Sequence, residues 1–212
     1  MIDKNNYSIT VFHNTPVVEC ESIKGNTNRK THLAKAMPYV GIDGQVLEFG
    51  VHTANTINRI ALYFNTDTIW GFDSFEGLPE DWHMSNRDIS PKGFFSIDSL
   101  PIVNDNVTLV KGWFNETLPL WIKKNPTPIK FLHLDADLYS STKEVLTLLN
   151  SQIVPGTIIV FDEMYHWKYP QKYTYWEQGE YRALKEWITE NNRAFVSLVR
   201  SKYMQVTIRI TK

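Results

Sequence analysis

The sequence has almost no cysteine and no long hydrophobic run. Its one cysteine, Cys20, excludes an intrachain disulfide and a cysteine-ligated zinc site. No apolar run approaches the roughly 18 residues that a membrane-spanning helix requires. Residues 1–6 lead into no apolar segment of the kind found in signal peptides. We therefore expect a cytoplasmic protein with no membrane partner.

An excess of charge of either sign is also missing. Lys and Arg together number 22 and Asp and Glu together number 23, which gives a formal net charge of −1. Proteins that bind nucleic acids or anionic membranes usually carry a strongly basic surface. The charge balance therefore predicts no nucleic-acid partner.

The length of 212 residues suits one domain, because α/β domains often exceed 200 residues. We expect residues 1–212 to form that domain, with residues 1–40 covering one side of the core. The long polar connection 79–101 is expected to act as a lid, since loops of this length usually serve a function. Aromatic residues make up 13% of the chain. Many of them lie in residues 165–176, a segment that we expect to overhang the site. Three roles remain open for these side chains: packing in the core, stacking on an acceptor, and contact between copies in a homo-oligomer.

Strand and helix patterns alternate from residue 46 onward. Short apolar runs predict buried strands, apolar residues at three- and four-residue spacing predict helices, and Ser141 and Glu144 have the spacing of a capping box. The expected strands are 46–51, 68–73, 107–110, 129–135, 157–162, 194–199 and 204–210, and the expected helices are 28–39, 53–64, 141–149 and 180–190. This order predicts an α/β fold with a Rossmann-like, doubly wound, mostly parallel seven-stranded sheet. Helices should cover both faces, and the last two strands should form an antiparallel hairpin.

Acidic residues gather at the ends of the expected strands. Ligands bind at the carboxyl ends of the strands in such sheets, so these residues are candidates for a functional rim. The alternative is that they are ordinary turn and helix-capping residues. The six are Glu48, Asp73, Asp135, Asp137, Asp162 and Glu163.

Three of these acids, Asp135, Asp162 and Glu163, form a candidate metal site. Clustered carboxylates repel one another unless one is protonated or a cation joins them. Ligation by oxygen alone suits a hard ion such as Mg²⁺. Neighbouring residues of a strand point to opposite faces, so Asp162 and Glu163 share an ion only where the backbone has turned. The alternative is that one of them caps a helix.

The loop after the first strand, residues 50–56, begins with Gly50, which allows close approach of a ligand to the backbone. It lacks the G-x-G-x-x-G pattern of dinucleotide-binding loops, which argues against a pyrophosphate site. The carboxylate of a bound amino acid needs less room than a pyrophosphate and could still bind the backbone amides of this loop. Asp73 ends the next strand, near the offset at which an acid binds ribose hydroxyls.

Five motifs together resemble the macrocin-type O-methyltransferases. They are VLEFGV (46–51), GFDSFEGLP (71–79), KGWFNETLP (111–119), LDADLYSST (134–142) and VFDE (160–163). The resemblance covers roughly residues 40–190. It implies a class I fold that uses S-adenosylmethionine (SAM) to methylate hydroxyl groups, many of them on the sugars of natural products.

The resemblance also implies roles for residues at matching positions. Asp137 would be the general base, and Asp135, Asp162 and Glu163 would be Mg²⁺ ligands. The family pair at the last two positions is Asp-Asp, so Glu163 is a departure. The implied SAM-binding residues are Glu48, Gly50, Thr53, Asp73, Ser74, Phe75, Gly112, Trp113, Phe114 and Asp135.

These observations lead to one function hypothesis and two alternatives. We expect a SAM-dependent O-methyltransferase, assisted by Mg²⁺, that acts on a hydroxyl of a small molecule or glycoside. A divalent ion lowers the pKa of a bound hydroxyl, and a carboxylate such as Asp137 takes the proton. The alternatives are a non-catalytic SAM-binding or assembly module and a nucleotide-dependent oxidoreductase.

Overall fold

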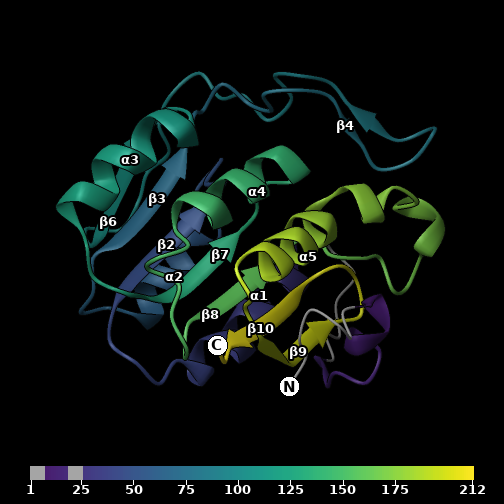
Figure 1. The fold of residues 1–212 in the computed structure, drawn as a ribbon. Helices are drawn as coiled ribbons and strands as arrows, with labels where there is room; N and C mark the ends of the chain where they lie inside the picture. Colours follow the sequence, from purple (N-terminus) through teal and green to yellow (C-terminus); the bar gives the residue numbers. More distant parts are fainter. Residues whose placement is uncertain (1–7, 19–25) are drawn as a thin grey trace.

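A computed structural model describes residues 8–18 and 26–212. Cys20 and parts of the expected cover segment 1–40 lie outside the described residues. The main sheet has the strand order β1-β9-β10-β8-β7-β2-β3-β6 (Figure 1). Its strands are β1 (Val17–Val18), β2 (Gln45–Phe49), β3 (Ile69–Asp73), β6 (Val107–Lys111), β7 (Ile129–Leu134), β8 (Ile158–Phe161), β9 (Phe195–Ser201) and β10 (Val206–Ile210).

The seven predicted strands are confirmed, and the two-residue strand β1 adds an eighth beside β9. Strands β6, β3, β2, β7 and β8 are parallel, whereas β10 runs antiparallel to both β8 and β9. Chain order moves outward in opposite directions from β2, toward β3 on one side and toward β7 on the other. This reversal marks the position where doubly wound sheets bind ligands.

Helices cover both faces of the sheet, as predicted (Figure 1). Apolar residues of α3, α4 and α5 pack in one core cluster, and those of α1 and α2 pack in a second. The longer helices are α1 (Asn26–Ala36), α2 (Ile57–Tyr63), α3 (Phe114–Lys124), α4 (Tyr139–Leu148) and α5 (Glu180–Glu190), and the short 3-10 turns are η1 (Ile9–Phe12), η2 (Met37–Tyr39), η3 (Pro170–Lys172) and η4 (Trp176–Gln178). Within the described part of the chain, no helix has the length and apolar character needed to cross a membrane.

The capping box predicted at Ser141 and Glu144 is wrong. Helix α4 begins two residues earlier, with Leu138 as its N-cap and no capping bond from a side chain. Ser141 and Glu144 instead line the main cavity. The spacing of a capping box recurs inside helices, so spacing alone misplaced the start.

Helix α3 was not predicted, and it contains Pro119. A proline has no backbone N–H and cannot bond to the carbonyl group four residues earlier, here that of Asn115. Burial of Leu118 and Trp121 against the sheet holds the helix together despite this loss.

The connection 79–101 contains a small antiparallel pair, β4 (Trp82–His83) and β5 (Ile89–Ser90). Figure 1 shows it crossing the top of the molecule, beyond the end toward which β3 points. Its Trp82 packs with Leu78 and Leu138 in a small third apolar cluster. The segment therefore lies above the carboxyl ends of the parallel strands.

Candidate active site

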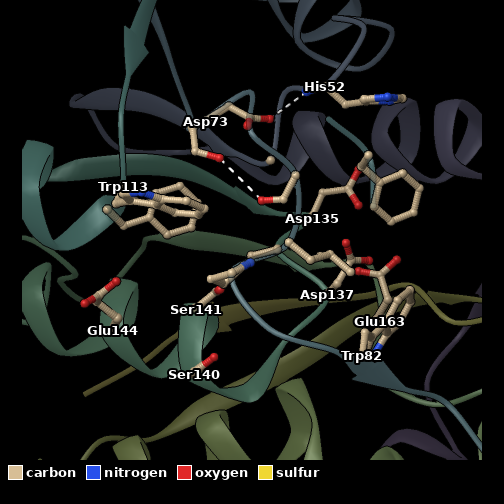
Figure 2. A pocket seen from close by; sticks show the side chains of 18 of the residues that line it. His52, Asp73, Trp82, Trp113, Asp135, Asp137, Ser140, Ser141, Glu144 and Glu163 are labelled. Atoms are coloured by element: carbon tan, nitrogen blue, oxygen red, sulfur yellow. Dashed lines mark hydrogen bonds between the residues drawn. The ribbon is translucent and has the colours of Figure 1, made fainter. Parts of the chain in front are cut away.

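A cavity of about 560 Å³ lies at the carboxyl ends of β2, β3, β7 and β8. Figure 2 shows Asp135, Asp137 and Glu163 together on one side of it and Trp113 on the other. The residues predicted from sequence that line this cavity are Gly50, Asp73, Ser74, Trp113, Phe114, Asp135, Asp137 and Glu163. The strand topology thus brings residues from five separate motifs to one space.

Gly50 lets β2 and β7 approach closely at the base of the cavity. Its φ is +87°, and a Cβ there would lie 1.9 Å from the carbonyl oxygen of Asp135. The following loop also turns at His52 and Ala54, with φ values of +45° and +62°. This loop takes left-handed backbone conformations without further glycines, and its turn delays the start of α2 to Ile57.

The carboxylate of Asp73 fixes this loop. Its Oδ2 accepts hydrogen bonds from the N–H groups of Val51 and His52, both at 2.8 Å, and its Oδ1 accepts one from Phe75 at 2.7 Å. Figure 2 shows the bond from His52. A carboxylate has about four lone-pair positions, so one on Oδ1 remains for a ligand. Asp73 therefore both shapes the loop and offers an acceptor to the cavity.

Asp137 sits in a tight turn directly after β7. Its φ is +60°, and the N–H of Leu138 donates to the carbonyl of Ala136 at 2.6 Å. Such a three-residue turn is strained for a residue other than glycine, and strain of this kind concentrates at functional sites. Burial, followed by the charge of Asp135, raises the pKa of Asp137 well above its usual value.

Three carboxylates converge on Arg29 of α1. Its Nη1 lies 3.0 Å from Asp135 Oδ2, its Nη2 lies 3.1 Å from Glu163 Oε1, and its Nε pairs with Asp162 Oδ2. Strand β8 has already ended at Phe161, so the backbone bends and both neighbouring acids reach the same group. Arg29 thus binds all three predicted metal ligands.

A second cation lies beneath this cluster. Nδ1 of the fully buried His133 is 2.7 Å from Oε1 of Glu48, and its Nε2 is 3.6 Å from Asp162 Oδ1. Burial alone would lower the pKa of His133, but Asp162 and Glu48 raise it to about 10. Burial disfavours ionisation of Asp162, yet Arg29 and His133 hold its pKa below the usual value.

Glu180, at the start of α5, supports the same cluster from below. It is fully buried, and its Oε2 accepts the backbone N–H of Glu163 at 2.9 Å. Its Oε1 accepts the hydroxyl of Thr142 at 3.2 Å. Glu180 thereby fixes the bend that carries Asp162 and Glu163.

Five predicted site residues do not line the cavity: Glu48, Thr53, Phe75, Gly112 and Asp162. Glu48 and Asp162 are buried directly beneath it, and Phe75 is buried behind the Asp73 turn. Thr53 is exposed and bonds with Asn55. Gly112 donates its N–H to the carbonyl of Asp73 at 3.0 Å. Roles for these five in cofactor or metal binding stay predictions.

No residue of the aromatic segment 165–176 lines the main cavity, but Tyr173 and Tyr175 line a neighbouring hollow together with Asp137 and Trp82. Trp167 and Trp176 pack against the first core cluster, and Tyr165 makes edge contacts with both. Trp82 and Met84 of the connection 79–101 line the cavity instead. Part of the segment thus packs in the core and part lies beside Asp137, so stacking on an acceptor and contact between copies stay predictions.

The donor atoms suit a hard ion by chemistry, since acidic oxygens of Asp135, Asp137 and Glu163 lie within 4.8 Å of one another. The carboxylates of Asp135 and Glu163, together with that of Asp162, already form ion pairs with Arg29. The three carboxylates predicted to bind a metal are therefore arranged around a guanidinium group in this structure.

Sequence reasoning missed Arg29, His133 and Glu180. A histidine inside an apolar strand, two residues before Asp135, was a signal for a buried polar partner. Glu180 was placed at a helix start but read only as part of the helix. No feature of the sequence around Arg29 indicates that it lies near strand ends more than a hundred residues later in the chain.

Comparisons with known proteins identify the family of this chain. The family model described as macrocin-O-methyltransferase (TylF) matches residues 21–190. The 8-demethyl-8-(2,3-dimethoxy-alpha-L-rhamnosyl)-tetracenomycin-C 4'-O-methyltransferase of Streptomyces olivaceus is 30% identical over 144 residues, which cover 58% of this chain and 54% of the relative. Mycinamicin III 3''-O-methyltransferase from Micromonospora griseorubida is 25% identical over 158 residues, which cover 64% of this chain and 61% of the relative. The chain thus matches little more than half the length of these relatives.

Solved structures agree on the fold. The calicheamicin methyltransferase CalS11 superposes with a TM-score of 0.68 at 22% identity, covering 88% of this chain and 80% of that one. The O-methyltransferase NovP superposes with a TM-score of 0.61 at 20% identity, covering 92% and 84%. Because the family model spans most of the sequence, including the strand-end acids around the cavity, the chain belongs to the macrocin-O-methyltransferase family.

Proposed function

We propose that this protein is a SAM-dependent O-methyltransferase that acts on a hydroxyl group. One observation carries the proposal: a single cavity at the strand reversal holds both the strand-end acid Asp73 and the strained acid Asp137. The first suits a ribose hydroxyl, and the second suits removal of a proton from an acceptor. Family membership supports the same reading.

The residues of the cavity fit SAM. Asp73 keeps one acceptor position for a ribose hydroxyl, and Trp113 and Phe114 offer aromatic surface for the adenine ring. The backbone at Gly50 comes to the cavity without a side chain, which leaves room for the amino-acid end. When bound, SAM would supply the methyl group.

Asp137 is proposed as the general base. Its raised pKa makes it a stronger base than an ordinary carboxylate, while Ser140 and Ser141 of α4 line the space next to it. The protein's main contribution to a displacement at a methyl group is position, because the reacting atoms must lie in line. The strained turn at Asp137 fixes the carboxylate for this purpose.

The acceptor is proposed to be a sugar hydroxyl of a glycosylated small molecule. The name of one relative above describes 4'-O-methylation of a rhamnosyl tetracenomycin compound, and that of the other describes 3''-O-methylation of mycinamicin III. Pro79, Trp82, Met84 and Phe95 line the outer part of the cavity. We propose that the connection 79–101 acts as the lid over this acceptor and that its aromatic surface packs on the sugar ring.

Magnesium assistance, a single-domain organisation and a homo-oligomeric state stay predictions. No step of the proposed reaction runs through Mg²⁺, because Arg29 holds Asp135, Asp162 and Glu163. The cytoplasmic location is likewise a prediction.

Calorimetric titration with S-adenosylhomocysteine, the demethylated product, tests the cofactor half. We expect micromolar binding, about −8 kcal/mol. Asp73→Asn should weaken it at least tenfold, because its NH₂ group would face a backbone N–H of Val51, His52 or Phe75. Asp105→Asn, at an exposed turn, is the matched control and should bind like the wild type. Absence of binding to the wild-type protein would refute the proposal.

A further inference from the structure

The acidic cluster of this protein contains its own cation. The guanidinium of Arg29 uses a different nitrogen for each of three carboxylates, Nη1 for Asp135, Nη2 for Glu163 and Nε for Asp162. Asp162 and Glu163 are almost fully buried, so their charge is poorly stabilised by water. Arg29 offsets that charge as a bound cation would.

Arg29 and a divalent ion compete for the same carboxylates. Magnesium binds carboxylate oxygens at about 2.1 Å in a strict octahedral arrangement, whereas the guanidinium lies 3.0 Å from Asp135 and 3.1 Å from Glu163. A guanidinium paired with three carboxylates already neutralises the charge that would attract an ion to them. Binding of one cation therefore weakens binding of the other.

Arg29 also faces the reaction space. It lines the same cavity as Asp137, and 31% of its side chain is exposed. A guanidinium has five N–H donors, and each of the three nitrogens of Arg29 lies against one carboxylate. Nη1 and Nη2 carry two hydrogens each, so each can also donate to a ligand oxygen.

We propose that Arg29 replaces the divalent ion of this site and donates a hydrogen bond to the acceptor oxygen, so that methyl transfer needs no metal. This inference rests on the proposed function. The acceptor oxygen forms its bond to the methyl carbon as the carbon–sulfur bond breaks, and sulfur keeps that electron pair. Asp137 takes the hydroxyl proton, and Arg29 stays positively charged and stabilises the developing negative charge.

The first test uses Mn²⁺ as a probe of the full chain, followed by electron paramagnetic resonance and calorimetry. The wild-type protein should show no single-site Mn²⁺ binding tighter than millimolar. Arg29→Ala, which frees the three carboxylates, should bind one Mn²⁺ at least tenfold more tightly. Arg59→Ala, an exposed arginine of α2, is the control and should behave as the wild type. One micromolar Mn²⁺ site in the wild type, unchanged in Arg29→Ala, would overturn the proposal.

The second test measures turnover in excess EDTA. Wild-type turnover should not change, and Arg29→Ala should lose about 10²- to 10³-fold in kcat, as for removal of one transition-state donor. Added Mn²⁺ should restore part of that loss. Arg29→Lys keeps the charge without the three-nitrogen fork, so its kcat should lie between the two. Loss of wild-type turnover in EDTA, or full turnover of Arg29→Ala in EDTA, would overturn the proposal.

Two further measurements keep these outcomes interpretable. Removal of a buried cation can prevent folding, so circular dichroism of Arg29→Ala is recorded first. If that variant is unfolded, the Mn²⁺ and EDTA results of the wild-type protein alone decide. S-adenosylhomocysteine titration separates the two proposals: failure to bind it refutes the methyltransferase function, whereas tight Mn²⁺ binding refutes only the role of Arg29.

Discussion

Replacement of Gly50 by alanine should damage both stability and the site. At its φ of +87°, an alanine costs about 1–2 kcal/mol. The new Cβ would also lie 1.9 Å from the carbonyl oxygen of Asp135, whereas such atoms normally stay about 3.3 Å apart. The ends of β2 and β7 must then separate, which strains the bond from Asp135 N–H to the Phe49 carbonyl. Overpacking of this kind adds about 1–3 kcal/mol.

Gly93→Ala is the matched control. Gly93 has a similar φ of +80°, but the nearest atom to its Cβ position is 4.0 Å away. The control should therefore lose only the 1–2 kcal/mol of backbone strain, and Gly50→Ala should lose about 2–5 kcal/mol in thermal or urea unfolding. Gly50→Ala should also bind S-adenosylhomocysteine at least tenfold more weakly. Equal stability and equal binding of the two variants would refute the close approach of β2 and β7.

Two further predictions concern stability. Contacts with Asp162 and Glu48 outweigh burial and raise the pKa of His133 to about 10, so the folded state holds this proton more tightly than the unfolded state. The resulting contribution to the free energy of unfolding is complete below pH 6.5 and is lost as the pH rises toward 10. The melting temperature should fall across that range, and His133→Gln, measured by the same melts, should remove much of the slope; an unchanged slope would contradict the assignment. Pro119→Ala should stabilise the protein by about 1–2 kcal/mol in urea unfolding, because alanine restores a helical hydrogen bond in α3; a loss of stability would show that the proline is required there.

The fold followed from the sequence because each of its main signals is local. Apolar runs such as that of β8 and the helical spacing of α5 specify elements without reference to the rest of the chain. The right-handed connection rule then fixes how they assemble. Helix α3 could not be predicted in the same way. Pro119 disfavours a helix locally, and burial of Trp121 outweighs that penalty only after the sheet has formed.

The sequence predicted only those site residues that lie at the carboxyl ends of the parallel strands. Asp73, Asp135 and Asp137 came together because parallel strands end at one edge. Arg29 comes from a helix on the other face of the sheet, and no spacing rule connects it to those strand ends. Its pairing depends on the packing of α1 against β8 and β9, which is a tertiary property.

The most direct test of the central claim is a parallel measurement on Asp137→Asn. Turnover is followed by transfer of a labelled methyl group to a panel of glycosides, and cofactor affinity by titration with S-adenosylhomocysteine. We expect kcat to fall by about 10²- to 10⁴-fold while the Kd stays within twofold of the wild type, because Asp137 acts on the acceptor proton alone. Unchanged turnover in Asp137→Asn would contradict the role of Asp137 as general base.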